Sequence, residues 1–328
     1  MRAVVLDGYG GPEVLRLQEL DDLVPGPEEL LVEVVATALN RADLLQRSGR
    51  YPQPGPKPLH EIPGLEFAGR VAAVGGRVSA WKVGDAVMGI LAGGGYASQV
   101  VIHERQAIPV PSGMAVADAA AIPEVWLTAW DALVLQGGLA PGGVALIHGG
   151  GSGVGTAGIQ LARWAGAQAV VTCSAGKVAR CLELGAAQAV DYRAGDPVAA
   201  VREVSGGRGA DVILDVIGGE NLDLNLDALA LKGRIVQVGT MGEGSAPIAL
   251  GKLMMKRAAL IGTVLRARPL EEKAALAQRF TREVLPAFVE GRLRPVIDRR
   301  FPLADIAAAQ EYLASDVTVG KVLIDVAP

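Results

Sequence analysis

The sequence predicts an α/β protein in which a β-rich domain is joined to a doubly wound domain built on a parallel sheet. Two observations support this prediction. Short β-rich segments separated by Gly and Pro fill the first 120 residues, whereas strand-like and helical segments alternate from Val144 to about Glu290. Strict alternation is typical of a parallel sheet with helices on both faces, and scattered short strands are typical of an antiparallel barrel.

The β-rich domain is expected to form a distorted barrel of mostly antiparallel strands. Its strand-like segments are 2–6, 29–36, 69–74, 86–90 and 96–102, and Gly and Pro clusters separate them. The stretch 52–58 alternates Pro with other residues, so an extended loop is expected there.

A helical pattern over 115–140 marks the crossing into the second domain, and Pro123 is expected to split or kink it. The strands expected beyond it are 144–148, 169–173, 189–190, 212–216, 234–238 and 258–264. Helices are expected at 177–184, 222–229 and 270–290. The tail holds a helix at 305–314 and a strand at 321–326, which fits best in the first domain's sheet. The predicted domains are therefore 1–122 with 297–328, and 123–296.

A glycine-rich turn separates the strand 144–148 from the following helix. It can be written Gly150-x-x-Gly153-x-Gly155-x-x-Gly158. Glycines allow positive φ and let backbone N–H groups approach a pyrophosphate at the positive end of the helix. With a strand before it and a helix after it, the turn predicts a dinucleotide-binding unit, and a turn that binds nothing is the alternative.

Two other glycine motifs are excluded by their neighbouring residues. A P-loop needs Gly-Lys followed by Ser or Thr, but the Gly-Lys pairs at 176, 251 and 320 precede Val or Leu. A nucleophile elbow needs Gly-x-Ser-x-Gly, but Val154 stands two residues after Ser152.

The end of the second strand in this domain favours NADPH over NADH. NAD-specific units usually carry an acid about 20 residues past the glycine motif, where it binds the ribose 2′-hydroxyl. This chain instead has Ser174 and Lys177 there, which can bond and neutralise a 2′-phosphate. Lys177 could otherwise be an ordinary exposed residue at a helix start.

Composition excludes several classes of partner. The chain has 328 residues, of which 50% are hydrophobic and 20% charged, and a net charge of −4, which leaves no electrostatic footprint for nucleic acid or an anionic membrane. No run of 18 apolar residues predicts a membrane span, and the apolar start is too short for a signal peptide. Two cysteines build no disulfide framework, so a cytoplasmic location is expected.

Motifs spread over the whole chain occur together in one protein family. They are 38–44 (ALNRADL), 49–51 (GRY), 64–69 (GLEFAG), 83–85 (VGD), 120–129 (AAIPEVWLTA), 148–149 with the glycine turn, and 320–322 (GKV). On these motifs the chain resembles the zinc-independent, zeta-crystallin-like quinone oxidoreductases of the medium-chain dehydrogenase/reductase superfamily, most of all their p53-inducible subgroup. The resemblance implies a GroES-like catalytic domain at both chain ends, a Rossmann domain between them and an active site in the cleft. It also implies a homodimer through the Rossmann edge strand near 258–265.

The chain departs from the zinc-dependent relatives at their ligand positions. Those enzymes have Cys where this chain has Asn40, and Gly-His-Glu where it has Gly-Leu-Glu at 64–66, and their four-cysteine lobe is absent. Zinc needs three or four N, S or O ligands held together, but His60, His103 and His148 show no such spacing. No catalytic zinc is expected.

Without zinc, reduction of an acceptor with an activated carbonyl is easier than alcohol oxidation. We therefore expect NADPH-dependent reduction of quinones, because hydride addition puts charge on an oxygen that hydrogen bonds can stabilise. Reduction of the double bond in enals, enones or enoyl thioesters is the alternative, and Arg47, Arg50 and Lys57 leave room for a thioester's phosphates. A protein that binds NADPH with little catalysis is a hypothesis of a different class.

The resemblance assigns roles to individual residues. The catalytic candidates are Asn40, Tyr51 and Thr128, which could otherwise be a turn residue, a packing residue and a helical threonine bonded to its own backbone. Asp43 either orients Asn40 or caps a helix. Within the cofactor set, the glycine turn is assigned to the pyrophosphate, Tyr192 to the adenosine end and Lys321 to the phosphate region. The cofactor-binding candidates are Asn40, Thr128, Gly150, Ser152, Gly153, Val154, Gly155, Ser174, Lys177, Tyr192, Gly239, Met241, Thr263 and Lys321.

Overall fold

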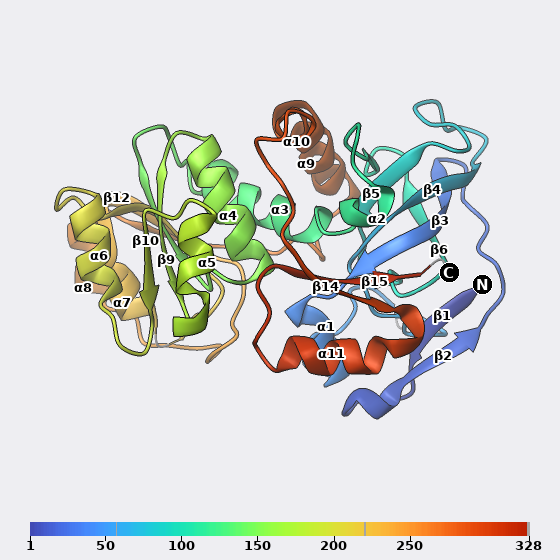
Figure 1. Ribbon diagram of the computed structural model, residues 1–328, viewed down its shortest axis with the longest axis horizontal. Coiled ribbons are helices and arrows are strands. Elements are labelled where there is room, and N and C mark those ends of the chain that lie inside the picture. Colours follow the sequence, from blue (N-terminus) through green and yellow to red (C-terminus); the bar gives the residue numbers. More distant parts are fainter. Residues whose placement is uncertain (57, 220, 327–328) are drawn as a thin grey trace. The chain divides into compact units, whose positions relative to one another are not determined.

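The computed structural model describes residues 1–56, 58–219 and 221–326, and the chain divides into two compact units (Figure 1). Unit 1 is Met1–Glu124 with Leu265–Pro328, and unit 2 is Val125–Val264. This division groups residues 265–296 with unit 1, whereas the sequence analysis assigns them to the second domain. The predicted domain boundary at residue 296 therefore stays a prediction. Lys57 lies outside the described residues.

Unit 1 is built around a mostly antiparallel sheet with the order β14-β15-β3-β4-β5-β7, in which β6 also pairs with β3. The first part of β3 pairs with β6 and its end pairs with β15, so β3 joins three neighbours. A separate two-stranded sheet joins β1 to β2. The strands are β1 (Arg2–Leu6), β2 (Leu15–Glu19), β3 (Glu29–Ala38), β4 (Glu66–Val74), β5 (Ala86–Ile90), β6 (Gln99–His103), β7 (Ile108–Pro109), β14 (Ile297–Pro302) and β15 (Lys321–Asp325).

The β-rich character expected for the first 120 residues is confirmed, and so is the return of the C-terminal strand to this sheet. In β15, Leu323 lies opposite Ala38 of β3. Along β3, Leu30, Val32 and Val34 are buried at every second position, which is the period of a strand with one face on a core. The core of unit 1 therefore unites both ends of the chain.

The helices of unit 1 correct one expectation. The single helix expected at 270–290 is two helices that meet at Val284, because Pro286 has no N–H to continue the first. The helices of this unit are α1 (Arg41–Arg47), α2 (Val116–Ala119), α9 (Leu270–Glu283), α10 (Leu285–Val289) and α11 (Ile306–Ala314). Helix α3 (Pro123–Trp130) begins at Pro123 and runs on into a π-helical stretch, Asp131–Gln136, so the expected break at Pro123 is confirmed.

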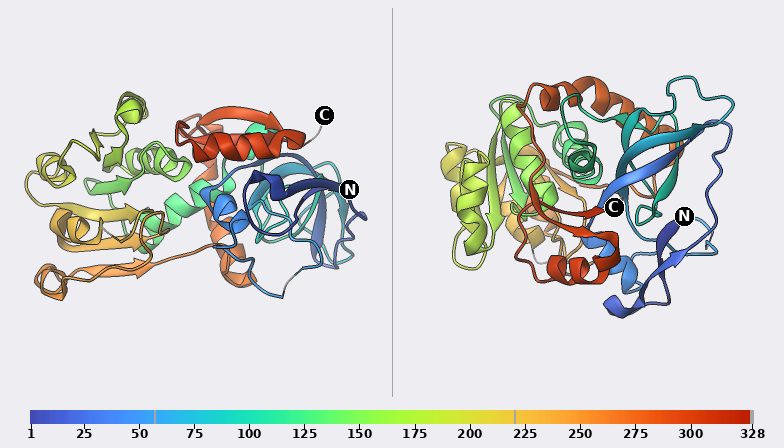
Figure 2. Two further views of the ribbon diagram at one scale, coloured as in Figure 1. Left: turned by 90° about the horizontal axis from the view of Figure 1, so that it is seen from below. Right: turned by 45° about the vertical axis from the view of Figure 1, so that its right-hand side comes forward.

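Unit 2 contains a parallel sheet with the order β10-β9-β8-β11-β12-β13. Figure 1 labels β9, β10 and β12 of this sheet, and Figure 2 gives two further views of the chain. The chain builds outward from β8 to β10 on one side and then from β11 to β13 on the other, which is the doubly wound topology expected. Its elements are β8 (Val144–His148), α4 (Gly153–Trp164), β9 (Gln168–Cys173), α5 (Val178–Glu183), β10 (Gln188–Asp191), α6 (Pro197–Val204), β11 (Ala210–Asp215), α7 (Asn221–Ala228), β12 (Leu229–Gln237), α8 (Leu250–Lys256) and β13 (Ala259–Gly262).

No helix among the described residues has both the length and the apolar character that a membrane span requires.

Candidate active site

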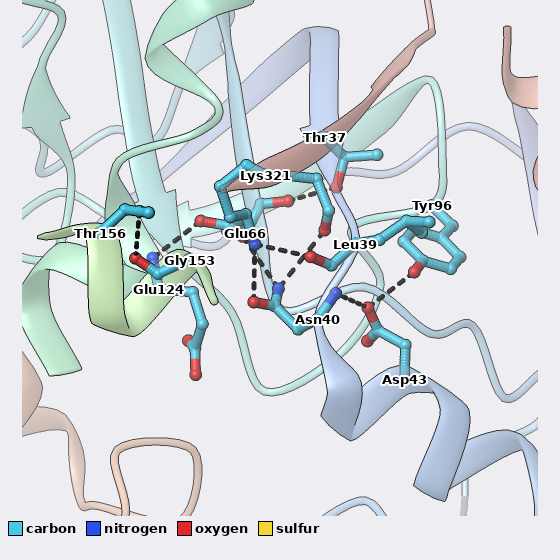
Figure 3. Close-up of polar contacts among 11 residues, drawn as sticks. Thr37, Leu39, Asn40, Asp43, Glu66, Tyr96, Glu124, Gly153, Thr156 and Lys321 are labelled. Atoms are coloured by element: carbon cyan, nitrogen blue, oxygen red, sulfur yellow. Dashed lines mark hydrogen bonds and ion pairs between the residues drawn. The ribbon is translucent and has the colours of Figure 1, made fainter. Parts of the chain in front are cut away.

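Three polar side chains meet at the ends of neighbouring strands in unit 1 (Figure 3). Lys321 is the first residue of β15, Asn40 follows β3, and Glu66 is the first residue of β4. The Lys321 ammonium donates to Glu66 Oε1 at 2.8 Å, to Asn40 Oδ1 at 2.7 Å and to the Leu39 carbonyl at 2.6 Å. Lys321 is 3% exposed and Glu66 is fully buried, so this is a buried ion pair in which every ammonium hydrogen is used.

The Glu66 carboxylate is held from both sides. The Asn40 amide donates to Glu66 Oε1 at 2.9 Å, and the Glu124 backbone N–H donates to Glu66 Oε2 at 2.8 Å. The Asn40 side chain is therefore engaged through both its oxygen and its nitrogen. Lys321, which the resemblance assigns to the phosphate region, would have to break one of its three bonds to contact a phosphate directly.

Asp43 fixes the backbone of Asn40 at the start of α1. Its Oδ2 accepts from the Asn40 N–H and from the Tyr96 hydroxyl, both at 2.7 Å. Burial raises the pKa of Asp43 to about 6. Asp43 thus caps the helix and also fixes the position of Asn40, which unites the two roles considered from the sequence.

Tyr51 is held by Arg266, a buried residue that sequence reasoning missed. The Arg266 guanidinium donates to the Tyr51 carbonyl at 3.1 Å, to the Ala92 carbonyl at 2.7 Å and to Gln46 Oε1 at 2.9 Å. Its central carbon lies 4.8 Å from the centroid of the Tyr51 ring, within the range of a cation–π interaction. Arg266 lies in no motif, so only its partners identify it as the anchor of this loop.

The glycine turn of unit 2 is closely packed at two of its glycines. Ser152 caps α4 by accepting the Gly155 N–H at 3.0 Å. A Cβ atom at Gly155 would lie 2.2 Å from the Gly149 carbonyl oxygen, and one at Gly150 would lie 2.6 Å from Val171 Cγ2. Side chains at these two positions would clash, so glycine is required there, and the turn passes tightly into the N-terminus of α4.

The residues expected to contact a 2′-phosphate lie at this turn. Ser174 directly follows β9, and Lys177 ends the short turn that begins after it. A Cβ atom at Gly151 would lie 2.6 Å from Lys177 Cδ, so the side chain of Lys177 packs against Gly151 of the glycine turn. The structure thus brings Lys177 and the turn together.

The remaining cofactor candidates of unit 2 follow the carboxyl ends of its strands, which meet at one edge of a parallel sheet. The Tyr192 N–H donates to the Cys173 carbonyl at 3.1 Å. Gly239 and Met241 follow β12. Thr263 follows β13, and its hydroxyl donates to Asp131 Oδ2 at 3.0 Å.

Thr128 lies on α3, and no hydrogen bond of its hydroxyl is found among the described residues. It is therefore not the backbone-bonded helical threonine that the sequence left open.

A buried polar chain that the sequence did not predict runs beneath the turn. His148 Nε2 lies 2.7 Å from Asn225 Oδ1, and His148 Nδ1 lies 2.9 Å from the Thr172 hydroxyl. The Asn225 amide nitrogen donates to Asp215 at 2.6 Å, so Asn225 Oδ1 is the acceptor and Nε2 carries the hydrogen. Burial lowers the pKa of His148, which keeps it neutral and accepting from Thr172.

No group of three or more His, Cys, Asp or Glu side chains suited to holding a metal ion occurs in the described part of the chain.

Comparisons with known proteins agree with this architecture. The family model for the alcohol dehydrogenase GroES-like domain matches residues 26–112, and the zinc-binding dehydrogenase model matches 153–281. A quinone oxidoreductase from Lama guanicoe is 34% identical over 99% of this chain and 97% of its own length. The chain belongs to the medium-chain dehydrogenase/reductase superfamily.

Solved structures of other medium-chain dehydrogenases/reductases share the whole fold. A quinone oxidoreductase from Escherichia coli, complexed with NADPH, has a TM-score of 0.89 and 29% identity, covering 99% of this chain and 100% of that one. The JamJ enoyl reductase has a TM-score of 0.88 and 26% identity, covering 99% of this chain and 98% of its own. This medium-chain dehydrogenase/reductase is therefore an oxidoreductase of a family that uses a nicotinamide cofactor.

Proposed function

We propose that this protein is a zinc-independent, NADPH-dependent quinone oxidoreductase. The observation that carries the proposal is the closed group of Lys321, Asn40 and Glu66. Asn40 Oδ1 and Glu66 Oε1 accept from an ammonium that belongs to the chain itself, and Glu66 Oε2 accepts from a backbone N–H, so these oxygens are engaged where a metal would need its ligands. Such a site suits an acceptor that is already activated, and the similarity to quinone oxidoreductases supports quinones as that acceptor.

NADPH fits the residues of unit 2. The tight glycine turn at the N-terminus of α4 suits a pyrophosphate, and Ser174 and Lys177 suit a 2′-phosphate. When bound, the cofactor supplies a hydride equivalent from its nicotinamide. In our proposal Gly239, Met241, Thr263 and Thr128 bind near the nicotinamide and Tyr192 near the adenosine.

Tyr51 is the proposed hydrogen-bond donor to the substrate oxygen. Its ring and carbonyl are held by Arg266, and its hydroxyl has no hydrogen-bond partner among the described residues. Burial raises the pKa of Tyr51, so the hydroxyl keeps its proton at neutral pH. Both polar atoms of the Asn40 amide are already hydrogen-bonded, so we propose that Asn40 positions the side chains of Lys321 and Glu66.

The substitution Tyr51→Phe should lower quinone turnover about 10-fold, the effect of losing one neutral hydrogen bond. The dissociation constant for NADPH should change little, because Arg266 still holds the loop. Steady-state kinetics and a fluorescence titration measure the two quantities. Tyr312→Phe removes the hydroxyl of a half-buried tyrosine bonded to Asp298 and serves as the matched control. Unaltered turnover in Tyr51→Phe would reduce Tyr51 to a packing role.

Loss of NADPH absorbance tests the function directly, with an ortho-quinone in one cuvette and a 2-alkenal in another. Chelator-insensitive turnover with the quinone is expected. Turnover with the alkenal alone would favour the second candidate, an enal, enone or enoyl-thioester reductase, which the similarity to an enoyl reductase supports. Tight NADPH binding with no turnover would favour a protein with little catalysis.

We further propose a homodimer in which two copies pair through β13. This strand is at the edge of its sheet and leaves Leu260 42% exposed, close in sequence to Met254 and Met255 on α8, which are 73% and 81% exposed. Unpaired edge strands and exposed apolar side chains favour association. In light scattering, Leu260→Asp should yield monomers. Val24→Asp, at an 86% exposed position of unit 1, should leave the dimer intact, and a dimer that persists in Leu260→Asp would contradict this interface.

We also propose a cytoplasmic location. Both cysteines, Cys173 and Cys181, are free thiols in the structure. Free thiols are the usual state in a reducing compartment.

A further inference from the structure

Glu124 lies next to the group formed by Lys321, Asn40 and Glu66, but its carboxyl takes no part in their hydrogen bonds. It is the second residue of α3, and its backbone N–H is bound by Glu66 Oε2. Figure 3 shows its carboxyl pointing away from Lys321 and Asn40. The side chain is partly exposed, and among the described residues nothing donates a hydrogen bond to its carboxyl oxygens.

Charged groups from several elements surround this carboxyl. Glu66 on β4 and Asp43 on α1 disfavour a second negative charge, while Lys321 on β15 and Arg266 favour it. Tyr51 and Lys273 of α9 also interact with it electrostatically. Burial is the largest influence, Glu66 the next, and together they raise the pKa of Glu124 to about 8.

We propose that the Glu124 carboxylic acid donates the proton that completes reduction of the acceptor. This inference rests on the proposed function. Hydride addition places an electron pair on the acceptor oxygen. The O–H bond of Glu124 then breaks as the new acceptor O–H bond forms, and the carboxylate recovers a proton from water at its exposed edge. The balance is NADPH + H⁺ + quinone → NADP⁺ + hydroquinone.

The other two carboxyl groups of this cluster are unsuited to the task. Glu66 is bound to Lys321, to Asn40 and to a backbone N–H. Asp43 is fully buried behind Tyr96 and Asn40. Glu124 combines a retained proton with access to solvent, which is what a recycling proton donor requires.

The substitution Glu124→Gln removes the proton while keeping the size and the backbone contact with Glu66. Quinone turnover should fall about 100-fold, as expected for the loss of a general acid, with a dissociation constant for NADPH within about twofold of wild type. The loss should be largest for quinones whose hydroquinones have a high pKa, because these need the donated proton most. Glu124→Asp, which keeps an acid, should recover part of the turnover. Glu311→Gln, at an exposed position on α11, is the matched control.

The pH dependence separates proton donation from a structural role. In wild type, turnover should decline as pH rises through about 8, because a carboxyl with a raised pKa loses its proton there. In Glu124→Gln this decline should be absent. Infrared difference spectra of the cofactor-free protein should show a protonated carboxyl band that disappears over the same pH range in wild type and is missing in Glu124→Gln.

Each result decides between the two proposals. An active wild type with unchanged turnover and pH profile in Glu124→Gln would overturn the role of Glu124 alone. An infrared band that titrates near pH 4 would overturn it as well, because ordinary glutamates titrate at about that pH. A wild type inactive toward quinones would overturn the proposed function and the proton donation with it.

Discussion

Replacing Lys177 by alanine is expected to weaken NADPH binding about 10- to 100-fold, while NADH binding changes little. The side chain of Lys177 packs against Gly151 of the glycine turn and follows Ser174 by three residues, and a 2′-phosphate bound there would carry the charge that distinguishes the two cofactors. A hydrogen bond to a charged group contributes about 1.5–3 kcal/mol, which corresponds to this range of affinity. NADH has no such phosphate and so loses no such bond.

The measurement for Lys177→Ala is the ratio of kcat/KM for the two cofactors, together with their dissociation constants. Arg180→Ala is the matched control, because Arg180 lies on α5 and has a surface ion pair with Glu183. That variant removes the same charge nearby and should leave the ratio unchanged. A ratio in Lys177→Ala equal to that of wild type would falsify the 2′-phosphate role.

The substitution Lys321→Met should reduce the free energy of unfolding by about 3–5 kcal/mol, the usual cost of breaking a buried ion pair. It would leave the Glu66 carboxylate charged and unpaired at a fully buried position, and the Leu39 carbonyl without its partner. Lys252→Met is the matched control, because Lys252 pairs with Asp223 and Asp227 at the surface. That loss should stay below about 1 kcal/mol.

Urea unfolding followed by tryptophan fluorescence and circular dichroism measures both losses. Adding Glu66→Gln to Lys321→Met removes the stranded charge, so the double variant should be more stable than the sum of the single losses predicts. Strictly additive losses, or equal losses at Lys321 and Lys252, would show that this pair contributes no more than a surface pair.

Features that depend on local patterns could be predicted from the sequence. The glycine turn, the alternation of strands and helices after β8 and the break at Pro123 each follow from residues close together in the chain. The pairing of β15 with a strand of unit 1 could also be predicted, because a single strand near the end of the chain needs a sheet to pair with. The prediction of one continuous helix over 270–290 was wrong, because the period of apolar residues continues past Val284 while Pro286 interrupts the hydrogen bonding.

The polar partners around the candidate site could not be predicted, because they are distant in the chain. Arg266 contacts Tyr51 from 215 positions away, and Lys321 contacts Leu39 from 282 positions away. Glu124 lies in the motif 120–129, but an acid in the first turn of a helix is common because it interacts favourably with the helix dipole. Its burial in the fold and its neighbour Glu66, distant in the chain, give its carboxyl an unusual environment. The roles of the site residues stay predictions that the variants test.

Unit 1 is assembled from the two ends of the chain, and this has a consequence during synthesis on the ribosome. Strand β3 and residue Asn40 emerge before unit 2, but β15 and Lys321 emerge after it. Unit 2, in contrast, is a continuous segment, Val125–Val264. We therefore expect unit 2 to fold first and the N-terminal segment to stay incomplete until β15 has been synthesised. This reverses the usual order in which N-terminal domains fold before those that follow.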